Sequence, residues 1–260
     1  MVMKIGLIGK GAIANYVSAA LEKRGHSIAV TLLRPVRVAE NPDHYVGSVQ
    51  DLPTDLDLMI DCAGHAALTE HGPAILSRGT DLITVSLGAL ADHHVFADLE
   101  TAAKQGRSKL HLASGAIGAL DCLQAARIGQ LNSVTYVGRK PPKGWAGSPA
   151  EQKLDLHALT SGAVTHFQGT ARDAALTYPK NANVAAAVAL AGIGFDATQV
   201  QLIADANVIE NIHEIDASGE FGNFHFRISG KSLPDNPRSS ALAAMSVVSK
   251  LDQIIQPISL

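Results

Sequence analysis

The first residues of the chain contain a glycine-rich turn of the kind that binds nucleotide phosphates. Gly9, Gly11 and Ala14 are spaced as G-x-G-x-x-A between an apolar run and an amphipathic run. Gly9 permits a tight turn, Gly11 has no Cβ to block a pyrophosphate, and Ala14 lets a helix pack closely on a strand. Glycine also shapes such turns for structural reasons alone, but the position of this pattern favours dinucleotide binding. The residues expected to bind are Gly9, Gly11, Ala12 and Ile13.

An arginine stands where an acidic residue usually binds the adenosine ribose of NAD. The second predicted strand ends at Leu33 and is followed by Arg34 and, three residues later, by Arg37. A guanidinium at this position can stack on adenine or bind a 2′-phosphate, so both NAD and NADP stay open as cofactors. The alternative is that both arginines are solvated loop residues.

Two segments of small residues follow later predicted strands. Ligands of open α/β sheets bind at the carboxyl ends of the strands. We therefore expect cofactor contacts from Ala63 and Gly64, and from the segment that contains Ser114 and Ala116. The glycines of these segments can equally serve only to shape turns.

His213 is the strongest candidate for acid–base chemistry among eleven histidines. It falls in a predicted strand, where a period of two places it on the face of Ile209 and Asn211. Glu210 and Glu214 lie on the opposite face. A histidine with a pKa near neutrality can take a proton from an amine or from water and return it, as amine oxidation followed by imine hydrolysis requires. From spacing alone, a structural histidine is the more common outcome.

A polar turn that contains Lys180 runs into an alanine-rich helix. Asn183 stands at its predicted N-cap, where an amide oxygen can accept hydrogen bonds from the first N–H groups of the helix. A helix N-terminus beside a cleft also suits a substrate carboxylate or a cofactor amide, and Lys180 would add positive charge. Capping alone explains Asn183 as well.

The elements that must position these residues follow two patterns. Up to about residue 115, short apolar runs alternate with amphipathic stretches, as in βαβ units that build a parallel sheet. The predicted strands span residues 4–8, 28–33, 45–49, 58–62, 82–86 and 109–113. The predicted helices span residues 12–24, 66–78, 95–105 and 119–131. This alternation predicts a Rossmann-type, doubly wound parallel sheet.

After about residue 132 the runs alternate apolar and polar residues, which is typical of a sheet with one exposed face. Its predicted strands span residues 134–137, 164–167, 201–204, 208–215 and 224–228. Residues 140–149 contain three prolines and two glycines, which predict a surface loop. We therefore predict a dinucleotide-binding domain at residues 1–118 and a second α/β domain, on a mixed and largely open-faced sheet, at 119–238. A closing helix, 239–260, is expected to pack back on the first domain.

Composition narrows the classes of partner. The net charge is −3 with no basic block, so the chain lacks the clustered cations that nucleic acid requires. Cys62 and Cys122 lie far apart, which predicts two buried thiols, no disulfide and no metal site. The chain enters an apolar strand at once, without a signal peptide, and no apolar run approaches the roughly 20 residues that span a bilayer. We expect a cytoplasmic protein that binds a small molecule and neither nucleic acid nor membrane.

Five motifs together resemble the L-aspartate dehydrogenase family. They occupy residues 9–14, 113–118, 180–185, 211–215 and 219–222, so the resemblance covers nearly the whole chain. The later motifs are much rarer in combination than a Rossmann turn, and they carry most of the weight.

The resemblance implies oxidation of L-aspartate by NAD or NADP to iminoaspartate, which hydrolyses to oxaloacetate and ammonia or feeds NAD biosynthesis. It implies that the second domain is catalytic and forms a homodimer. By motif, Ala116 and Asn183 match the NAD-binding positions of the family, and His213 matches its active-site histidine. Ser114 and Lys180 are further candidates for contacts to substrate. Two alternatives stay open: a dehydrogenase or reductase of another small aspartate-derived or dicarboxylic substrate, and a non-catalytic protein that senses nicotinamide cofactors.

Overall fold

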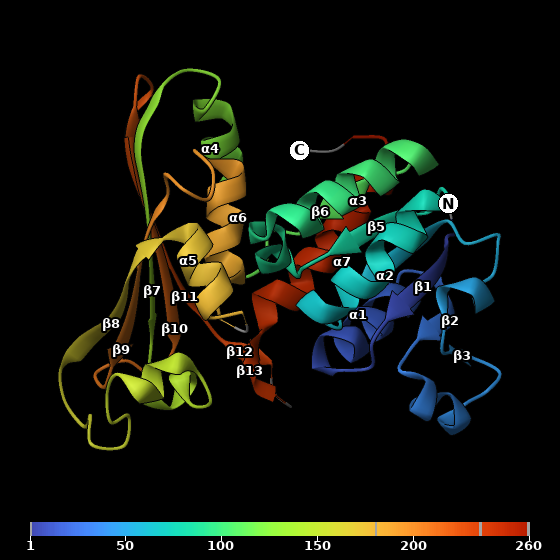
Figure 1. Cartoon of the computed structure of the whole chain (residues 1–260), viewed down its shortest axis with the longest axis horizontal. Helices are drawn as coiled ribbons and strands as arrows, with labels where there is room; N and C mark the ends of the chain where they lie inside the picture. The colour runs from blue at the N-terminus through green and yellow to red at the C-terminus, as the bar shows by residue number, and fades with distance from the viewer. Residues whose placement is uncertain (1, 180, 234–235, 259–260) are drawn as a thin grey trace. The chain divides into compact units, whose positions relative to one another are not determined.

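Six short apolar strands of the N-terminal half pair as a parallel sheet in the computed structural model, which describes residues 2–179, 181–233 and 236–258. The strands are β1 (Lys4–Ile8), β2 (Ser27–Leu32), β3 (Tyr45–Val46), β4 (Leu58–Asp61), β5 (Asp81–Thr84) and β6 (Leu110–Leu112). Their order is β3-β2-β1-β4-β5-β6, which is the Rossmann order, so the predicted fold class is confirmed (Figure 1). The order reverses between β1 and β4, and this point is where such sheets bind ligands.

Four helices pack against this sheet and explain why its central strands are apolar throughout. They are α1 (Ala12–Glu22), α2 (His65–Ser77), α3 (His93–Gly106) and α7 (Ala241–Ile255). Val17 of α1 and Val247 and Leu251 of α7 join the buried core around Ile5 and Ile60. The C-terminal helix thus completes the core of the N-terminal sheet.

A second sheet of five strands follows, in the order β11-β10-β7-β9-β8. Its strands are β7 (Leu131–Lys140), β8 (Ala163–Thr170), β9 (Gln199–Asp205), β10 (Asn211–Gly219) and β11 (Gly222–Gly230). β7 and β9 pair in parallel and the other pairs are antiparallel, so this sheet is mixed, as predicted. A short antiparallel pair follows it, formed by β12 (Ser232–Leu233) and β13 (Asn236–Ser240).

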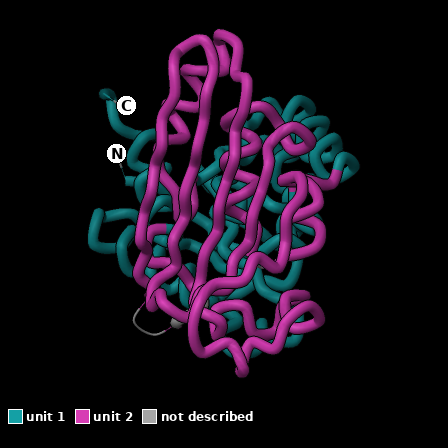
Figure 2. Tube along the Cα trace, turned by 90° about the vertical axis from the view of Figure 1, so that its left-hand side faces the viewer, with its two compact units in different colours: residues 1–89, 93–113, 243–260 teal, residues 90–92, 114–242 magenta. Residues whose placement is uncertain are grey.

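Three helices cover one face of the second sheet, and none of the described helices lies on its other face (Figures 1 and 2). They are α4 (Leu120–Ala126), α5 (Ala171–Thr177) and α6 (Asn183–Ala191). Val134 and Tyr136 of β7 are buried, whereas the intervening Thr135 and Val137 are half-buried. The alternation follows from the period of two in a strand. No helix in the described part of the chain is long and apolar enough to cross a membrane.

The chain divides into two compact units, shown in different colours in Figure 2. Unit 1 consists of residues 1–89, 93–113 and 243–260, and unit 2 consists of residues 90–92 and 114–242. The first unit contains the parallel sheet and the second contains the mixed sheet.

Residues 140–149 lie at the surface, as their prolines and glycines predict, but they are ordered by short helical turns and one buried ring. Two 3-10 helices, η4 (Pro142–Trp145) and η5 (Pro149–Gln152), shape the segment. Trp145 is fully buried, and its indole N–H donates a hydrogen bond to the carbonyl oxygen of Ile203 at 2.9 Å. The large apolar ring anchors the segment to β9, and this outweighs its turn-forming composition.

Several predicted boundaries were wrong. The predicted helix at 119–131 ends at Ala126, because Leu131 already begins β7. The predicted strand at 208–215 begins only at Asn211, and Ile209 is 91% exposed in the preceding turn. Ala182, not Asn183, is the N-cap of α6, so the helix begins at Asn183, one residue earlier than predicted. Cys122 is exposed, contrary to the prediction of two buried thiols. The buried side chain of the short helix α4 is that of Leu123, and Cys122 faces away from the core.

Candidate active site

The predicted phosphate-binding turn lies at the point where the order of strands in the parallel sheet reverses. Gly9 follows β1 with φ of +95°, a conformation that favours glycine, and its N–H donates to the carbonyl oxygen of Leu32 at 3.0 Å. A Cβ on Gly9 would lie 2.9 Å from the Cβ of Ala63, which follows β4. The two predicted segments therefore meet, and only glycine fits between them.

Gly11 has a different environment from Gly9. It is the exposed N-cap of α1, and a Cβ built on it would meet no atom within 4 Å. Ala12 and Ile13 lie in the first turn of α1. The backbone N–H groups of such a turn have no partner within the helix and can bind an anion. Gly64, with φ of +100°, begins α2 in the same way after β4. Open backbone at two helix N-termini fits the phosphates of a dinucleotide.

The two arginines after β2 differ in their partners. Arg37 forms a two-point ion pair with Glu40, at 2.7 and 2.9 Å, and this pair holds the pKa of Glu40 below its ordinary value. Arg34 is exposed and has no ion pair with any described residue. Of the two guanidiniums, only that of Arg37 is therefore engaged by a carboxylate of the described residues.

Asp61, which the sequence did not single out, braces the same edge of the sheet. It is fully buried at the end of β4, and burial raises the pKa of its carboxyl group. Its oxygens accept hydrogen bonds from the Ala63 N–H at 2.9 Å, the Thr84 hydroxyl at 2.8 Å and the Ser86 hydroxyl at 2.6 Å. The carboxylate therefore fixes the position of Ala63 relative to β5.

In unit 2, His213 lies on β10 and is held by a tyrosine from β7. Its side chain is 4% exposed, and its Nδ1 lies 2.7 Å from the Tyr136 hydroxyl. The two rings are nearly parallel, with an angle of 18° between their planes. The register pairs His213 with Gly138, and a Cβ on Gly138 would lie 2.7 Å from the Tyr136 hydroxyl. Glycine at 138 therefore makes the space that the phenol needs to reach the histidine.

Burial decides the protonation state of this pair. Desolvation, assisted by the charge of Lys140, lowers the pKa of His213 to about 3, so the imidazole is neutral at physiological pH. Desolvation raises the pKa of Tyr136, so the phenol keeps its proton. When Nδ1–H donates this hydrogen bond to the phenol oxygen, the other nitrogen of the neutral imidazole, Nε2, carries the lone pair that can accept a proton.

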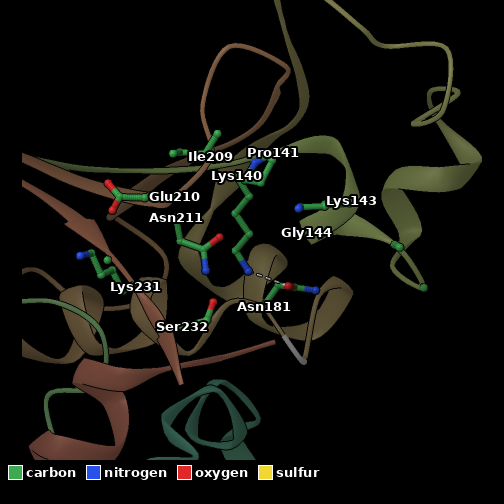
Figure 3. A pocket seen from close by; sticks show the side chains of 13 residues that line it. Lys140, Pro141, Lys143, Gly144, Asn181, Ile209, Glu210, Asn211, Lys231 and Ser232 are labelled. Carbon is green, nitrogen blue, oxygen red and sulfur yellow. Dashed lines mark hydrogen bonds between the residues drawn. The ribbon is translucent and has the colours of Figure 1, made fainter. Parts of the chain in front are cut away.

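A pocket of about 720 Å3 opens where β7 ends and β10 begins, and Figure 3 shows the side chains that line it. Lys140 ends β7 and Asn211 begins β10, two residues from Gly138 and His213 respectively, and they therefore lie on the same face as the His213–Tyr136 pair. Burial lowers the pKa of Lys140 to about 8. The lining residues are Lys140, Pro141, Lys143, Gly144, Ala146, Gly147, Asn181, Ile209, Glu210, Asn211, Gly230, Lys231 and Ser232.

The other predicted residues of unit 2 lie in separate segments. Ser114 is half-buried and Ala116 is buried in the segment before α4. Asn183 is half-buried in the first turn of α6. Lys180 lies outside the described residues. The roles of Ser114, Ala116, Asn183 and His213 stay predictions, since the structure alone assigns no ligand to them.

Sequence reasoning placed Asn211 on the face of His213 but missed three further residues around it: Tyr136, Lys140 and Asn181. A usable signal was present in β7, where the period of two places Tyr136, Gly138 and Lys140 on one face. No signal within the sequence paired that face with β10. Among the described residues, no three His, Cys, Asp or Glu side chains converge as a metal site requires.

Comparison with known proteins matches the two units to two different family models. A family model described as "Aspartate dehydrogenase, C-terminal" matches residues 121–254, and one described as "Homoserine dehydrogenase, NAD binding domain" matches residues 9–113. The L-aspartate dehydrogenase of Ruegeria pomeroyi is 54% identical over 255 residues, which cover 96% of this chain and 92% of that protein. That of Pseudomonas aeruginosa is 42% identical over 267 residues, 99% of this chain and 100% of that protein.

A solved structure shows the same fold over its full length. The crystal structure of aspartate dehydrogenase from Thermotoga maritima covers 100% of both chains, with a TM-score of 0.79 and 24% identity. The resemblance stated from the motifs is confirmed by the model that matches more than half of the chain and by the full-length relatives. The chain belongs to the L-aspartate dehydrogenase family.

Proposed function

We propose that this protein oxidises L-aspartate with NAD or NADP to iminoaspartate, which water converts to oxaloacetate and ammonia. The observation that carries the proposal is the buried, neutral His213, held by Tyr136 on the sheet face that leads to a lysine-lined pocket. The membership of the family and its full-length relatives named L-aspartate dehydrogenase support the choice of substrate.

The cofactor would be held by the residues at the reversal point of the parallel sheet. Gly9, Gly11, Ala12 and Ile13 suit the pyrophosphate, and Arg34 suits the adenosine end. Ala63 and Gly64 line the same edge, and Ala116 and Asn183 are the family's NAD-binding positions by motif. When bound, the oxidised nicotinamide supplies an acceptor for the hydride of the substrate α-carbon.

His213 would serve the proton steps on the substrate side. The substrate ammonium must lose its proton before the amine can become an imine, and at alkaline pH this proton goes to solvent rather than to an imidazole whose pKa is about 3. As a neutral base His213 would accept a proton from the water that attacks the imine carbon and deliver it to the departing nitrogen, so that the C–N bond breaks and ammonia leaves. Tyr136 holds Nδ1 during both transfers, and Nε2 exchanges the proton.

A steady-state assay of L-aspartate with each cofactor tests this function. We expect aspartate-dependent reduction of NAD or NADP at alkaline pH, and His213→Ala is expected to lower kcat by at least about 100-fold while cofactor affinity is retained. Cofactor binding is followed by quenching of protein fluorescence from the single tryptophan or by calorimetry. Absence of aspartate-dependent reduction with either cofactor would contradict the proposal.

The helix-free face of the second sheet suits a contact between two copies of the chain. It carries paired charges, such as Glu214 with Arg227 at 3.2 Å and Arg139 with Asp205 at 2.8 Å. We propose a homodimer through this face, in the cytoplasm, whose iminoaspartate can feed NAD biosynthesis. Analytical ultracentrifugation checks the first part, and a monomer at micromolar concentration would rule it out.

A further inference from the structure

Lys140 is a half-buried cation for which the described residues supply no counter-ion. It is half-buried at the end of β7, and no described carboxylate lies within 4 Å of its Nζ. Taking an ammonium out of water without a partner destabilises a folded protein, and the lowered pKa of Lys140 reflects that cost. A bound ligand of negative charge would offset the cost of keeping the Lys140 ammonium charged.

The surroundings of Lys140 hold its ammonium in one place. Its Nζ donates a hydrogen bond to the Asn181 Oδ1 at 2.8 Å and lies 4.9 Å from the centre of the Trp145 ring. Gly144 passes over its aliphatic stem, since a Cβ there would be 3.2 Å from the Lys140 Cβ. An ammonium has three N–H donors and Asn181 takes one, so donors remain for a ligand.

We infer that Lys140, with Asn181 and Asn211, binds a carboxylate group of the substrate; the inference rests on the proposed function. Figure 3 shows the Lys140 side chain directed between these two amides, towards Ser232. Lys143 and Lys231 add positive charge to the lining, against the single acid Glu210 among the described lining residues. The pocket therefore favours a small anion.

The position of the Lys140 ammonium relative to His213 suits a substrate that has a carboxylate at one end and a reacting amine further along. Asn211 and His213 are two residues apart on β10, and Lys140 and Gly138 are two apart on β7, so all lie along one sheet face. A carboxylate at Lys140 would direct the rest of a short substrate along that face. The charge of Lys140 also lowers the pKa of His213, in agreement with their proximity.

Binding of succinate to the full-length protein tests the site without any turnover. Succinate has both carboxylates of aspartate and no amine, and calorimetry gives its Kd. We expect Lys140→Met to raise this Kd at least tenfold, because a hydrogen bond to a charged group is lost. Lys153→Met removes the same charge from an exposed position of unit 2 outside the pocket and should leave the Kd unchanged. Binding by Lys140→Met within twofold of the wild type overturns the inference.

A second variant guards against misfolding of the first. Asn211→Asp keeps the size of the side chain but places a carboxylate in the pocket, where it repels a bound anion. Circular dichroism and thermal melting show that each variant is folded. We expect Asn211→Asp also to weaken succinate binding at least tenfold, and unchanged binding by this variant would count against the site as strongly.

Substrate analogues distinguish the two carboxylates. L-asparagine lacks the β-carboxylate and L-isoasparagine lacks the α-carboxylate. If Lys140 binds the β-carboxylate, Lys140→Met loses most of the preference for aspartate over asparagine; if it binds the α-carboxylate, the preference over isoasparagine is lost. Retention of both preferences overturns the inference. Succinate binding at Lys140 by a wild type that does not oxidise aspartate would instead contradict the proposed function and leave the site intact.

Discussion

At the scale of single residues, unit 2 contains two buried histidine–tyrosine pairs that differ in their surroundings. His213 is bonded to Tyr136 on the face that leads to the lysine-lined pocket. His166 lies 3.1 Å from the Tyr178 hydroxyl, packed against the edge of Trp145. Burial lowers the pKa of both imidazoles, to about 3 for His213 and about 4 for His166. The same pair of groups thus serves the proposed chemistry in one place and core packing in the other.

Tyr136→Phe tests whether the phenol positions His213. The substitution keeps the ring and removes the hydrogen bond to Nδ1, so the tautomer and orientation of the imidazole are no longer held. We expect kcat to fall about 10- to 100-fold while the KM values for aspartate and cofactor change little. The measurement is steady-state kinetics from pH 6 to 10, with a changed pH profile of kcat as the sign of a lost proton-transfer geometry.

The matched control is Tyr178→Phe, which removes the equivalent hydroxyl from the pair in the aromatic cluster. It should lower stability somewhat and leave kcat and its pH profile as in the wild type. If both variants reduce kcat equally, with unchanged profiles, then Tyr136 acts only through stability and has no positioning role.

At the scale of elements, the turn between β1 and α1 separates two uses of glycine. Gly9 has φ of +95° and a Cβ on it would meet Ala63 at 2.9 Å, so its glycine is required by the fold. Gly11 has extended backbone at the N-cap of α1 and open space around its missing Cβ, so the fold alone does not require glycine there. The space at Gly11 is instead where a pyrophosphate would approach the helix.

The paired variants Gly9→Ala and Gly11→Ala should therefore have different effects. Gly9→Ala is expected to lower the free energy of unfolding by about 1–3 kcal/mol, since it forces a left-handed conformation and a close contact on alanine. Gly11→Ala should change that free energy by less than about 1 kcal/mol but raise the Kd for NAD or NADP at least tenfold. Urea unfolding and calorimetric titration measure the two effects. Tight cofactor binding by Gly11→Ala would show that the turn does not hold the pyrophosphate as proposed.

At the scale of the whole molecule, the buried histidines couple the stability of the fold to pH. Both have a pKa in the folded protein that is lower than the value of about 6.5 in an unfolded chain. As the pH falls below about 6.5, the unfolded state binds protons that the folded state does not, and stability decreases. The decrease continues down to the folded pKa values, near 4 for His166 and near 3 for His213.

His166→Gln isolates one of these contributions. Between pH 6 and 4.5 we expect the free energy of unfolding of this variant to fall less steeply than that of the wild type. The difference between the two slopes should be about 1.4 kcal/mol per pH unit, because the unfolded variant no longer binds one proton more than the folded variant at this position. Urea unfolding at half-unit steps of pH provides the slopes. The exposed His157 supplies the control, since His157→Gln should give a curve parallel to that of the wild type. Equal slopes for His166→Gln and the wild type would contradict a neutral, buried His166.

Local patterns were sufficient for much of this protein. The alternation of apolar runs and helices predicted the parallel sheet, because each βαβ unit is encoded in about 30 consecutive residues. Gly9, Gly11 and Ala14 predicted the phosphate-binding turn, because all its determinants lie within six residues. His213 was singled out from its strand and a motif, although the strand begins at Asn211 and not at 208, because residues 206–210 form an irregular turn in which Ile209 is exposed.

The sequence by itself therefore determined the fold class and the family, and it named the glycine turn and His213 as the candidates for cofactor binding and proton transfer. Only the tertiary structure decided how that histidine is held and what lies beside it. Tyr136 is 77 residues away in sequence from His213, and Lys140 is 41 residues away from Asn181. These pairs exist because the register of β7 and β10 and the buried Trp145 bring distant segments together, and neither register nor long-range packing is written in any local pattern.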